Sequence, residues 1–325
     1  MSASIEQFTQ SLRERMTVPS LGLDDDSRFA YWLLLPSIAM MALIHFIPMV
    51  WGFVISFMEV NDSTFIDWMS APISPLKQYG AIFQPDTAVG AEFWSSLVET
   101  FLFAFGTTIG VYVLGLTTAL LLNKSFRGKF TARTLVLIPY FAPAVATIYI
   151  WRMMFTADTG VVNELLVWLG VINSTDEVFW LIGNNALISM IVVNIWKNFP
   201  FAAIMLYAGL QSIPEQLYEA ASIDGASRWA TFRYVTLPQL KPVTAVIILL
   251  MIVWSFINFT IPYLLLDKNP ENGEVLMLFI YNFAFQNGDY SLGAALSIIL
   301  LVISMVISYG YYRATMQSSV QGGAV

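Results

Sequence analysis

Two groups of polar and aromatic side chains lie at helical spacing within long apolar stretches, and they are well suited to binding chemistry. In each group the members are at positions i, i+3, i+4 and i+7, so they share one face of a helix. The groups are Asn194, Lys197, Asn198 and Phe201 in one stretch and Met251, Trp254, Ser255 and Asn258 in the other. Amides and a hydroxyl beside aromatic rings suit a sugar, because rings stack on its C–H surface and polar groups bind its hydroxyls.

The same spacing has a second interpretation. Polar groups inside a bilayer are costly, and they face either a cavity or a neighbouring helix. Asn198, Ser255 and Asn258 could therefore bind a ligand or could simply hold helices together. The ammonium of Lys197 could pair with an anionic ligand, or it could have a structural or gating role.

Residues 212–242 form an interior segment that is less apolar than its flanks but has clear helix signals. Ser212 and Glu215 match a capping box, which predicts a helix start at Ser212. Gly225 predicts a left-handed end for that helix. Trp229, Phe232 and Arg233 then indicate a second short helix, which is expected to end before Pro238. The expected product is two short helices that meet at a glycine.

Such a pair also resembles a soluble helix-turn-helix, in which an Ala-x-x-x-Gly spacing is common. Only Arg228 and Arg233 provide basic charge in the segment before Pro238, and long apolar stretches flank it on both sides. Pro242 falls where the first turn of a following apolar helix is expected. A DNA-binding role is therefore not favoured.

The composition is that of an integral membrane protein. Of the 325 residues, 57% are hydrophobic and 11% are charged, against about 25% charged in ordinary soluble domains. The mean hydropathy is +0.68. The net charge of −7 argues against nucleic acid as a partner, and it gives a weak hint of a high-salt habitat. The sequence has no cysteine, so disulfide and thiol chemistry are excluded.

Six apolar stretches are long enough to cross about 30 Å of hydrocarbon as helices, which predicts an all-α, polytopic fold. The expected spans are residues 29–58, 96–122, 134–155, 184–210, 243–266 and 291–312. Three acidic connecting loops separate them on one side, at residues 59–94, 156–182 and 267–290.

The distribution of lysine and arginine predicts the orientation, because cytoplasmic loops of membrane proteins carry an excess of both. If both termini, the 123–133 loop and the 212–242 segment share one side, that side collects 11 of the 15 basic residues. This side is expected to be the cytoplasm. The chain then divides into a cytoplasmic segment at residues 1–28, a six-span domain at 29–313 and a cytoplasmic tail at 314–325. We expect a multi-pass protein of the cell membrane. In a cell with two membranes, this is the inner one.

The 212–242 segment resembles the cytoplasmic "EAA" loop of ABC-importer permeases. The resemblance is carried by Glu219-Ala220-Ala221, Asp224-Gly225-Ala226, Leu237-Pro238 and Pro242. In that family the loop is the coupling helix that docks into a groove of the ATPase. The resemblance therefore implies a coupling role for Glu219, Ala220, Ala221, Asp224, Gly225 and Pro238.

The resemblance extends over residues 76–313, and its pattern is similar to the carbohydrate, maltose-like branch. It includes Leu114-Gly115-Leu116, Trp196-Lys197, Ala208-Gly209-Leu210-Gln211 and Gly293-Ala294-Ala295. It implies the type I importer permease fold, a sugar cargo, a second similar permease, two ATPase subunits and an extracytoplasmic binding protein. Similar permeases often carry a basic residue after this tryptophan, which favours a structural or gating role for Lys197. The outer loop at 267–273 departs from the family's pattern.

Other chemistry is not indicated. The phosphate-binding motif G-x-x-x-x-G-K-[ST] does not occur in the sequence, so ATP and magnesium are expected on the partner ATPase, with no cofactor, metal or catalytic residue in this chain. The single histidine, His45, has no motif partner. Three alternatives remain: a polyol or glycerol-phosphate cargo, a non-transporting adaptor, and an ion-coupled secondary transporter. The last is disfavoured because Glu99 is the only carboxylate within a predicted span.

Overall fold

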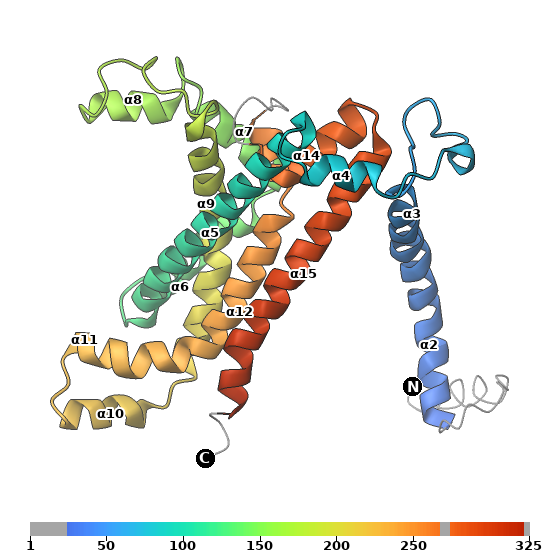
Figure 1. Cartoon of the computed structure of the whole chain (residues 1–325). Helices are drawn as coiled ribbons and strands as arrows, with labels where there is room; N and C mark the ends of the chain where they lie inside the picture. The colour runs from blue at the N-terminus through green and yellow to red at the C-terminus, as the bar shows by residue number, and fades with distance from the viewer. Residues whose placement is uncertain (1–24, 267–273, 322–325) are drawn as a thin grey trace, which may run out of the picture.

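The computed structural model describes residues 25–266 and 274–321, and the described chain is a helical bundle with one isolated β-bridge, between Met58 and Ile73. Most of the long helices run side by side at a slant through the molecule (Figure 1). The predicted all-α multi-pass fold is confirmed. The predictions for residues 1–24 and for the departure at 267–273 lie outside the described residues.

Within the described residues, five helices are long and apolar enough to cross a membrane. They are Phe29–Ile55, Ala88–Asn123 (α5), Asn184–Gln211 (α9), Arg228–Phe256 and Tyr290–Thr315, the last being part of α15 (Tyr290–Gln321). A sixth crossing consists of α6 (Lys129–Phe141) and α7 (Ala144–Met154), which meet at a bend of 90°. The six predicted spans are therefore present if this bent pair is one span, and the third of them is broken near its middle.

The fifth span begins earlier than the sequence predicted. The chain is helical from Arg228 through α11 (Arg228–Thr231), η3 (Phe232–Thr236) and α12 (Leu237–Phe256). The predicted closure before Pro238 and a span at 243–266 are both wrong. A π-helical turn precedes Pro238, and its wider hydrogen bonds, such as Leu237 N–H to Phe232 O, carry the helix into the proline. After Phe256 the chain leaves the helix and re-enters a short one, α13 (Thr260–Leu265).

The centre of the bundle is the contact of α5 with α9 and α12, whose side chains share one buried cluster that includes Val111, Leu206 and Ile247. Small residues permit close approach of helices in membranes. A Cβ at Gly110 would lie 2.1 Å from Ile195, and one at Gly115 would lie 2.7 Å from Ala202. This packing places the two predicted polar faces, on α9 and α12, next to each other.

Short elements gather at the two ends of the bundle. At one end lie η2 (Trp68–Ser70), α4 (Lys77–Phe83), α8 (Val161–Trp168), α14 (Leu276–Tyr281) and η4 (Asn282–Gln286). At the other end lie α10 (Glu215–Ile223) and α11, together with the start of α2 and the end of α15 (Figure 1). The described ends of the chain therefore share a side with the 212–242 segment, as the basic residues predicted.

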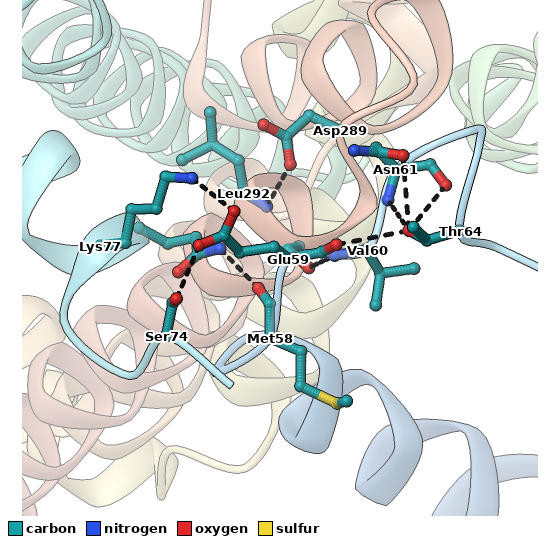
Figure 2. A network of polar contacts seen from close by, with 11 residues as sticks. Met58, Glu59, Val60, Asn61, Thr64, Ser74, Lys77, Asp289 and Leu292 are labelled. Carbon is teal, nitrogen blue, oxygen red and sulfur yellow. Dashed lines mark hydrogen bonds and ion pairs between the residues drawn. The ribbon is translucent and has the colours of Figure 1, made fainter. Parts of the chain in front are cut away.

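The first span stands apart from the bundle (Figure 1). It comprises α2 (Asp25–Met41), the π-turn η1 (Ala42–Phe46) and α3 (Ile47–Ile55), and only 6% of its apolar window is buried. Its outer end is attached to the start of α15 by a polar network (Figure 2). The N–H of Val60 donates to Ser291 Oγ at 2.7 Å, and Glu59 accepts from Ser74 and Lys77 at 2.6 and 2.5 Å.

Candidate functional site

A cavity of about 370 Å³ lies between α7, α9, α12 and α13 and is open on one side. Its volume falls within the usual range for small-molecule sites. Five of the eight residues predicted for a substrate pathway line it: Asn194, Lys197, Asn198, Trp254 and Asn258. The structure therefore brings the two predicted polar faces together around one space.

The wall on α9 is ordered by a chain of amide hydrogen bonds. Asn198 Nδ2 donates to the side-chain oxygen of Asn194 at 2.6 Å. Asn194 Nδ2 in turn approaches Thr107 Oγ1 on α5 and Ser255 Oγ on α12, both at 3.4 Å. Asn194 is only 2% exposed, so these contacts satisfy a polar group that would otherwise be costly to bury. Asn194 thus serves mainly to join three helices.

The opposite wall carries an aromatic ring and an amide. Trp254 is 39% exposed and its ring lies 5.3 Å from that of Phe201, centroid to centroid. Asn258 accepts a hydrogen bond from the N–H of Ile261 at 3.1 Å, which closes the start of α13. Its Nδ2 donates to no residue in the described part of the chain. An aromatic ring and an amide that can donate therefore both line the cavity.

Three predicted pathway residues do not line the cavity. Met251 is 1% exposed and belongs to the α5–α9–α12 core. Ser255 is 4% exposed and contacts Asn194, while Phe201 stands behind Trp254 and stacks on Tyr140. For Met251 and Ser255 the packing interpretation describes the geometry better.

Other lining residues were not singled out from the sequence. Thr147 comes from α7, Phe259 comes from the break after α12 and Thr260 begins α13. They reach the cavity only because two helices are interrupted. The signals for these interruptions were the two prolines at 139 and 143 and the Pro262 that follows the polar run.

Lys197 projects from α9 to the bend between α6 and α7. Its Nζ donates to the backbone carbonyls of Pro139, Tyr140 and Ala142, at 3.0, 3.1 and 2.5 Å. An ammonium group has three N–H donors, so these contacts can use all of them. The side chain lines the cavity while its charge is directed into the end of a helix.

The 212–242 segment ends its first helix as the sequence predicted, at Gly225. This glycine has φ +73°. The N–H of Ala226 donates to Ala221 O at 2.9 Å and the N–H of Gly225 to Ser222 O at 3.1 Å, which together form a Schellman motif. Ser227 then starts α11, where its Oγ accepts from the N–H of Ala230 at 3.2 Å.

The predicted capping box at Ser212 and Glu215 is wrong. α10 begins at Glu215 with Pro214 as its N-cap, and no side chain caps it. The residue before a proline is disfavoured in the helical region, so the helix cannot start as early as Ser212. Instead Ser212 ends α9, and its Oγ donates to Gly209 O at 2.8 Å.

The segment presents its residues to solvent. Glu219, Ala220, Asp224, Gly225 and Pro238 are exposed, and Ala221 is half-buried. Four large apolar side chains are also exposed there: Leu217 at 38%, Ile223 at 86%, Trp229 at 71% and Tyr234 at 77%. One hydrogen bond between side chains, Tyr218 to Thr236 at 3.3 Å, ties α10 to the following helix. These residues are therefore accessible to a partner.

Comparisons with known proteins agree with this arrangement. Residues 111–317 match the family described as "Binding-protein-dependent transport system inner membrane component". The trehalose/maltose transport system permease protein MalF of Thermococcus litoralis is 34% identical over 289 residues, covering 87% of this chain and 93% of that protein. The inner membrane ABC transporter permease protein YcjO of Escherichia coli is 33% identical over 287 residues, covering 87% and 92%.

The fold is also found in a solved structure. A bacterial alginate ABC transporter, crystallised with an alginate pentasaccharide-bound periplasmic protein, contains a chain that superposes with a TM-score of 0.73. The match covers 89% of this chain and 94% of that one, at 24% identity. With its apolar spans, its exposed loop at Gly225 and these relatives, the chain belongs to the binding-protein-dependent inner membrane components, the multi-pass permeases of ABC importers.

Proposed function

We propose that this permease passes a neutral carbohydrate through the cavity between α7, α9, α12 and α13. The observation that carries the proposal is the wall formed by Trp254 and Asn258, since a ring face and an amide donor suit a sugar's C–H surface and hydroxyls. The name of the Thermococcus litoralis relative, which refers to trehalose and maltose, supports the same cargo class.

A phosphorylated polyol fits the cavity less well. Lys197 is the one cationic side chain among the described residues that line it. Its ammonium donates to three backbone carbonyls, so an anionic cargo would have to compete with them. An ion-coupled secondary transporter is not favoured, because the family match is to importers that use a binding protein.

In the proposed assembly the chain supplies pathway and coupling, and partners supply the rest. The partners are a second, similar permease, two ATPase subunits and an extracytoplasmic binding protein that delivers the sugar. ATP and magnesium bind the ATPase subunits, and this chain holds no cofactor. The exposed residues around Gly225, with Ile223 and Trp229, are the docking surface for the ATPase.

The test is purification of the intact complex, followed by reconstitution with its binding protein in vesicles. Neutral disaccharides are expected to stimulate ATP hydrolysis and to be taken up, whereas glycerol phosphate is expected to do neither. Stimulation by glycerol phosphate alone would contradict the proposed cargo. Failure of any ATPase subunit to co-purify would contradict the proposed assembly.

Glu219→Lys tests the docking surface in the same preparation. Reversal of this exposed charge is expected to reduce recovery of the ATPase and sugar-stimulated hydrolysis, while the permease remains in the membrane. Glu215→Lys is the matched control, because Glu215 is exposed on the same helix but lies outside the family's motif. Equal effects of the two changes would show that Glu219 has no special role.

A further inference from the structure

We propose that Lys197 is a positioning residue that closes the broken end of α6, in place of the N–H that Pro143 lacks, and so holds the wall of the cavity in place. It would then act on transport through the backbone at the bend and not as a ligand for the cargo. The role in transport rests on the proposed function of the cavity; the structural role does not.

The break leaves carbonyl groups without helical partners. The last backbone hydrogen bond of α6 runs from the N–H of Ala142 to Ile138 O, at 2.9 Å. The next would be donated by residue 143 to Pro139 O, but Pro143 has no N–H. Beyond it, Ala142 is extended at ψ 137° and the chain turns by 90°, so Tyr140 O also loses its helical donor, the N–H of Ala144.

Such groups are costly at this position, because a bilayer core contains no water to bind them. Interrupted backbone within membranes persists only where protein or a water-filled cavity satisfies it. Lys197 provides that satisfaction. Its Nζ bonds to Pro139 O and Tyr140 O, the two carbonyls at the end of α6, and to Ala142 O in the link.

The charge of Lys197 also suits this place. The carbonyl end of a helix carries a partial negative charge, and cations near it are stabilising. Three donors meet three acceptors, so the ammonium is both neutralised in part and fully hydrogen-bonded. An apolar residue of similar length, such as methionine, would leave all three carbonyls without this donor.

A second contact fixes the other end of α6 to the same helix. Arg133 donates to the hydroxyl of Tyr207, and its guanidinium lies 4.4 Å from the centre of that ring. Lys197 and Tyr207 are separated by about 15 Å along α9 at 1.5 Å per residue. α6 is therefore attached to α9 near both of its ends, and the bend that follows is held at a fixed place on α9.

The position of the bend matters because the helix after it forms part of the cavity wall. Ala144, Thr147 and Ile148 of α7 line the cavity together with the residues of α9. If the end of α6 were released, α7 would lose its fixed starting point. The expected result is a cavity of changed shape, with cargo affinity affected less than the rate of passage.

The experiment is a double-mutant cycle in the complete, purified transporter. Lys197→Met removes the donor, and Pro143→Ala restores the backbone N–H that could serve Pro139 O. We expect Lys197→Met to lower the thermal unfolding midpoint clearly, and to lower it by less than half as much in the Pro143→Ala background. Pro242→Ala, a proline change inside α12 and away from the bend, is the matched control and should give no such relief.

Uptake kinetics supply the second measurement. Lys197→Met is expected to reduce the maximal uptake rate at least tenfold while half-saturation changes less than threefold, and Lys197→Arg, which keeps the charge and donors, should recover most of the rate. A tenfold change in half-saturation, with additive effects in the thermal cycle, would identify Lys197 as a cargo ligand and overturn the proposal.

Assembly and cysteine labelling of the variants provide two further readouts. If Lys197→Met does not assemble, recovery of assembly in the double variant supports the proposal and continued failure contradicts it. The chain has no native cysteine, so labelling of Ala144→Cys reports the position of α7 directly, and an unchanged labelling rate in Lys197→Met would also contradict the proposal. The thermal cycle requires no cargo; a wrong sugar assignment would therefore appear in uptake alone.

Discussion

Two helix ends in this permease are closed in opposite ways. At Gly225 the end of α10 is closed by the backbone N–H groups of Gly225 and Ala226, in an exposed loop. At Pro143 the end of α6 is closed by the side chain of Lys197, which is 55 to 58 residues away in the sequence. Near water a local turn is sufficient, because solvent binds whatever carbonyls remain. Within a span the missing donor has to come from another helix.

The starts of helices show the same contrast. α11 is started by the neighbouring side chain of Ser227. In α14 the N–H of Leu276 donates at 2.7 Å to Thr100 Oγ1, which lies on α5 and is 176 residues away. Local closure is sufficient in an exposed loop, whereas long-range closure joins spans into one unit. The predictions that follow test this contrast.

The largest effect is expected at Gly225. No atom lies within 4 Å of a Cβ placed there, so Gly225→Val acts through the positive φ alone, at a cost on the order of 1–3 kcal/mol. Uptake and recovery of the ATPase should be lost while the chain stays in the membrane. Gly225→Asn should retain function, because asparagine tolerates this backbone conformation.

Gly128 provides the matched control for that change. It has φ +85° and equally open surroundings, but it lies between α5 and α6. Gly128→Val should introduce comparable strain without loss of ATPase recovery. If Gly128→Val abolished coupling as well, or if Gly225→Val coupled normally, the local closure at Gly225 would have no special part in docking.

A smaller effect is expected at the cavity. Asn258→Ala and Trp254→Ala should each lower transport while assembly is retained. Loss of one hydrogen bond to a hydroxyl costs about 0.5–1.5 kcal/mol, roughly a threefold to tenfold loss of affinity. The quantity to measure is sugar uptake into vesicles.

The Asn258 change needs its own control, because this side chain also closes α13 through Ile261. A serine hydroxyl oxygen can accept a hydrogen bond, so Asn258→Ser keeps an acceptor for that N–H and removes the amide donor. Equal transport losses in Asn258→Ala and Asn258→Ser would assign the effect to cargo binding. Normal transport by Asn258→Ser would show that only the helix closure matters, and normal transport in all three variants would place the cargo site elsewhere.

The contrast also predicts different stability losses at the two helix starts. Thr100→Val leaves the buried N–H of Leu276 without its acceptor, which should cost about 1–3 kcal/mol. Ser227→Ala should lower the global thermal midpoint by less, because water can replace the cap at an exposed start. Thr117→Val, on the exposed face of α5, is the control. An equal or larger loss in Ser227→Ala would break the contrast.

The smallest effect concerns pH at the outer end. Burial raises the pKa of Glu274 to about 7; Asn282 lowers the pKa, and Glu92 and Glu99 raise it further. The folded carboxyl thus holds its proton more tightly than an unfolded one of pKa 4.5. Its contribution to stability is complete below about pH 4.5 and is lost as the pH rises through about 7.

Thermal midpoints measured between pH 5 and pH 8 check this sign. The wild-type midpoint should fall as the pH rises, and Glu274→Gln should reduce the fall. Glu164→Gln, at an exposed carboxylate in α8, should leave the fall of the midpoint with pH unchanged. A wild-type midpoint that rises over this range would contradict the assigned shift.

The sequence-based predictions of helix ends also differ between local and long-range closure. The helix end at Gly225 was predicted correctly, because glycine and its neighbours suffice for that turn. The start of α10 was misplaced by three residues, from Ser212 to Glu215, because Pro214 competes with the capping box. The fifth span was misplaced further, since the π-turn before Pro238 carries the helix through a position where proline usually ends one.

For the cavity, helical spacing alone identified two faces whose Asn194, Lys197, Asn198, Trp254 and Asn258 now surround one space. It could not separate Met251 and Ser255 from them, because residues at i, i+3 and i+4 cover a wide arc and only the packing of α5 decides which part of it is covered. Thr147 and Thr260 were missed because they line the cavity through interruptions of helices.

The sequence by itself determined the all-α multi-span fold and the turn at Gly225, since apolar length and glycine act over a few neighbouring residues. Only the tertiary structure decided where the charge of Lys197 goes. Its choice between a cargo and the carbonyls of Pro139, Tyr140 and Ala142 depends on how α9 is rotated against α6. That rotation is set by packing among α5, α9 and α12, and no short stretch of the chain contains it.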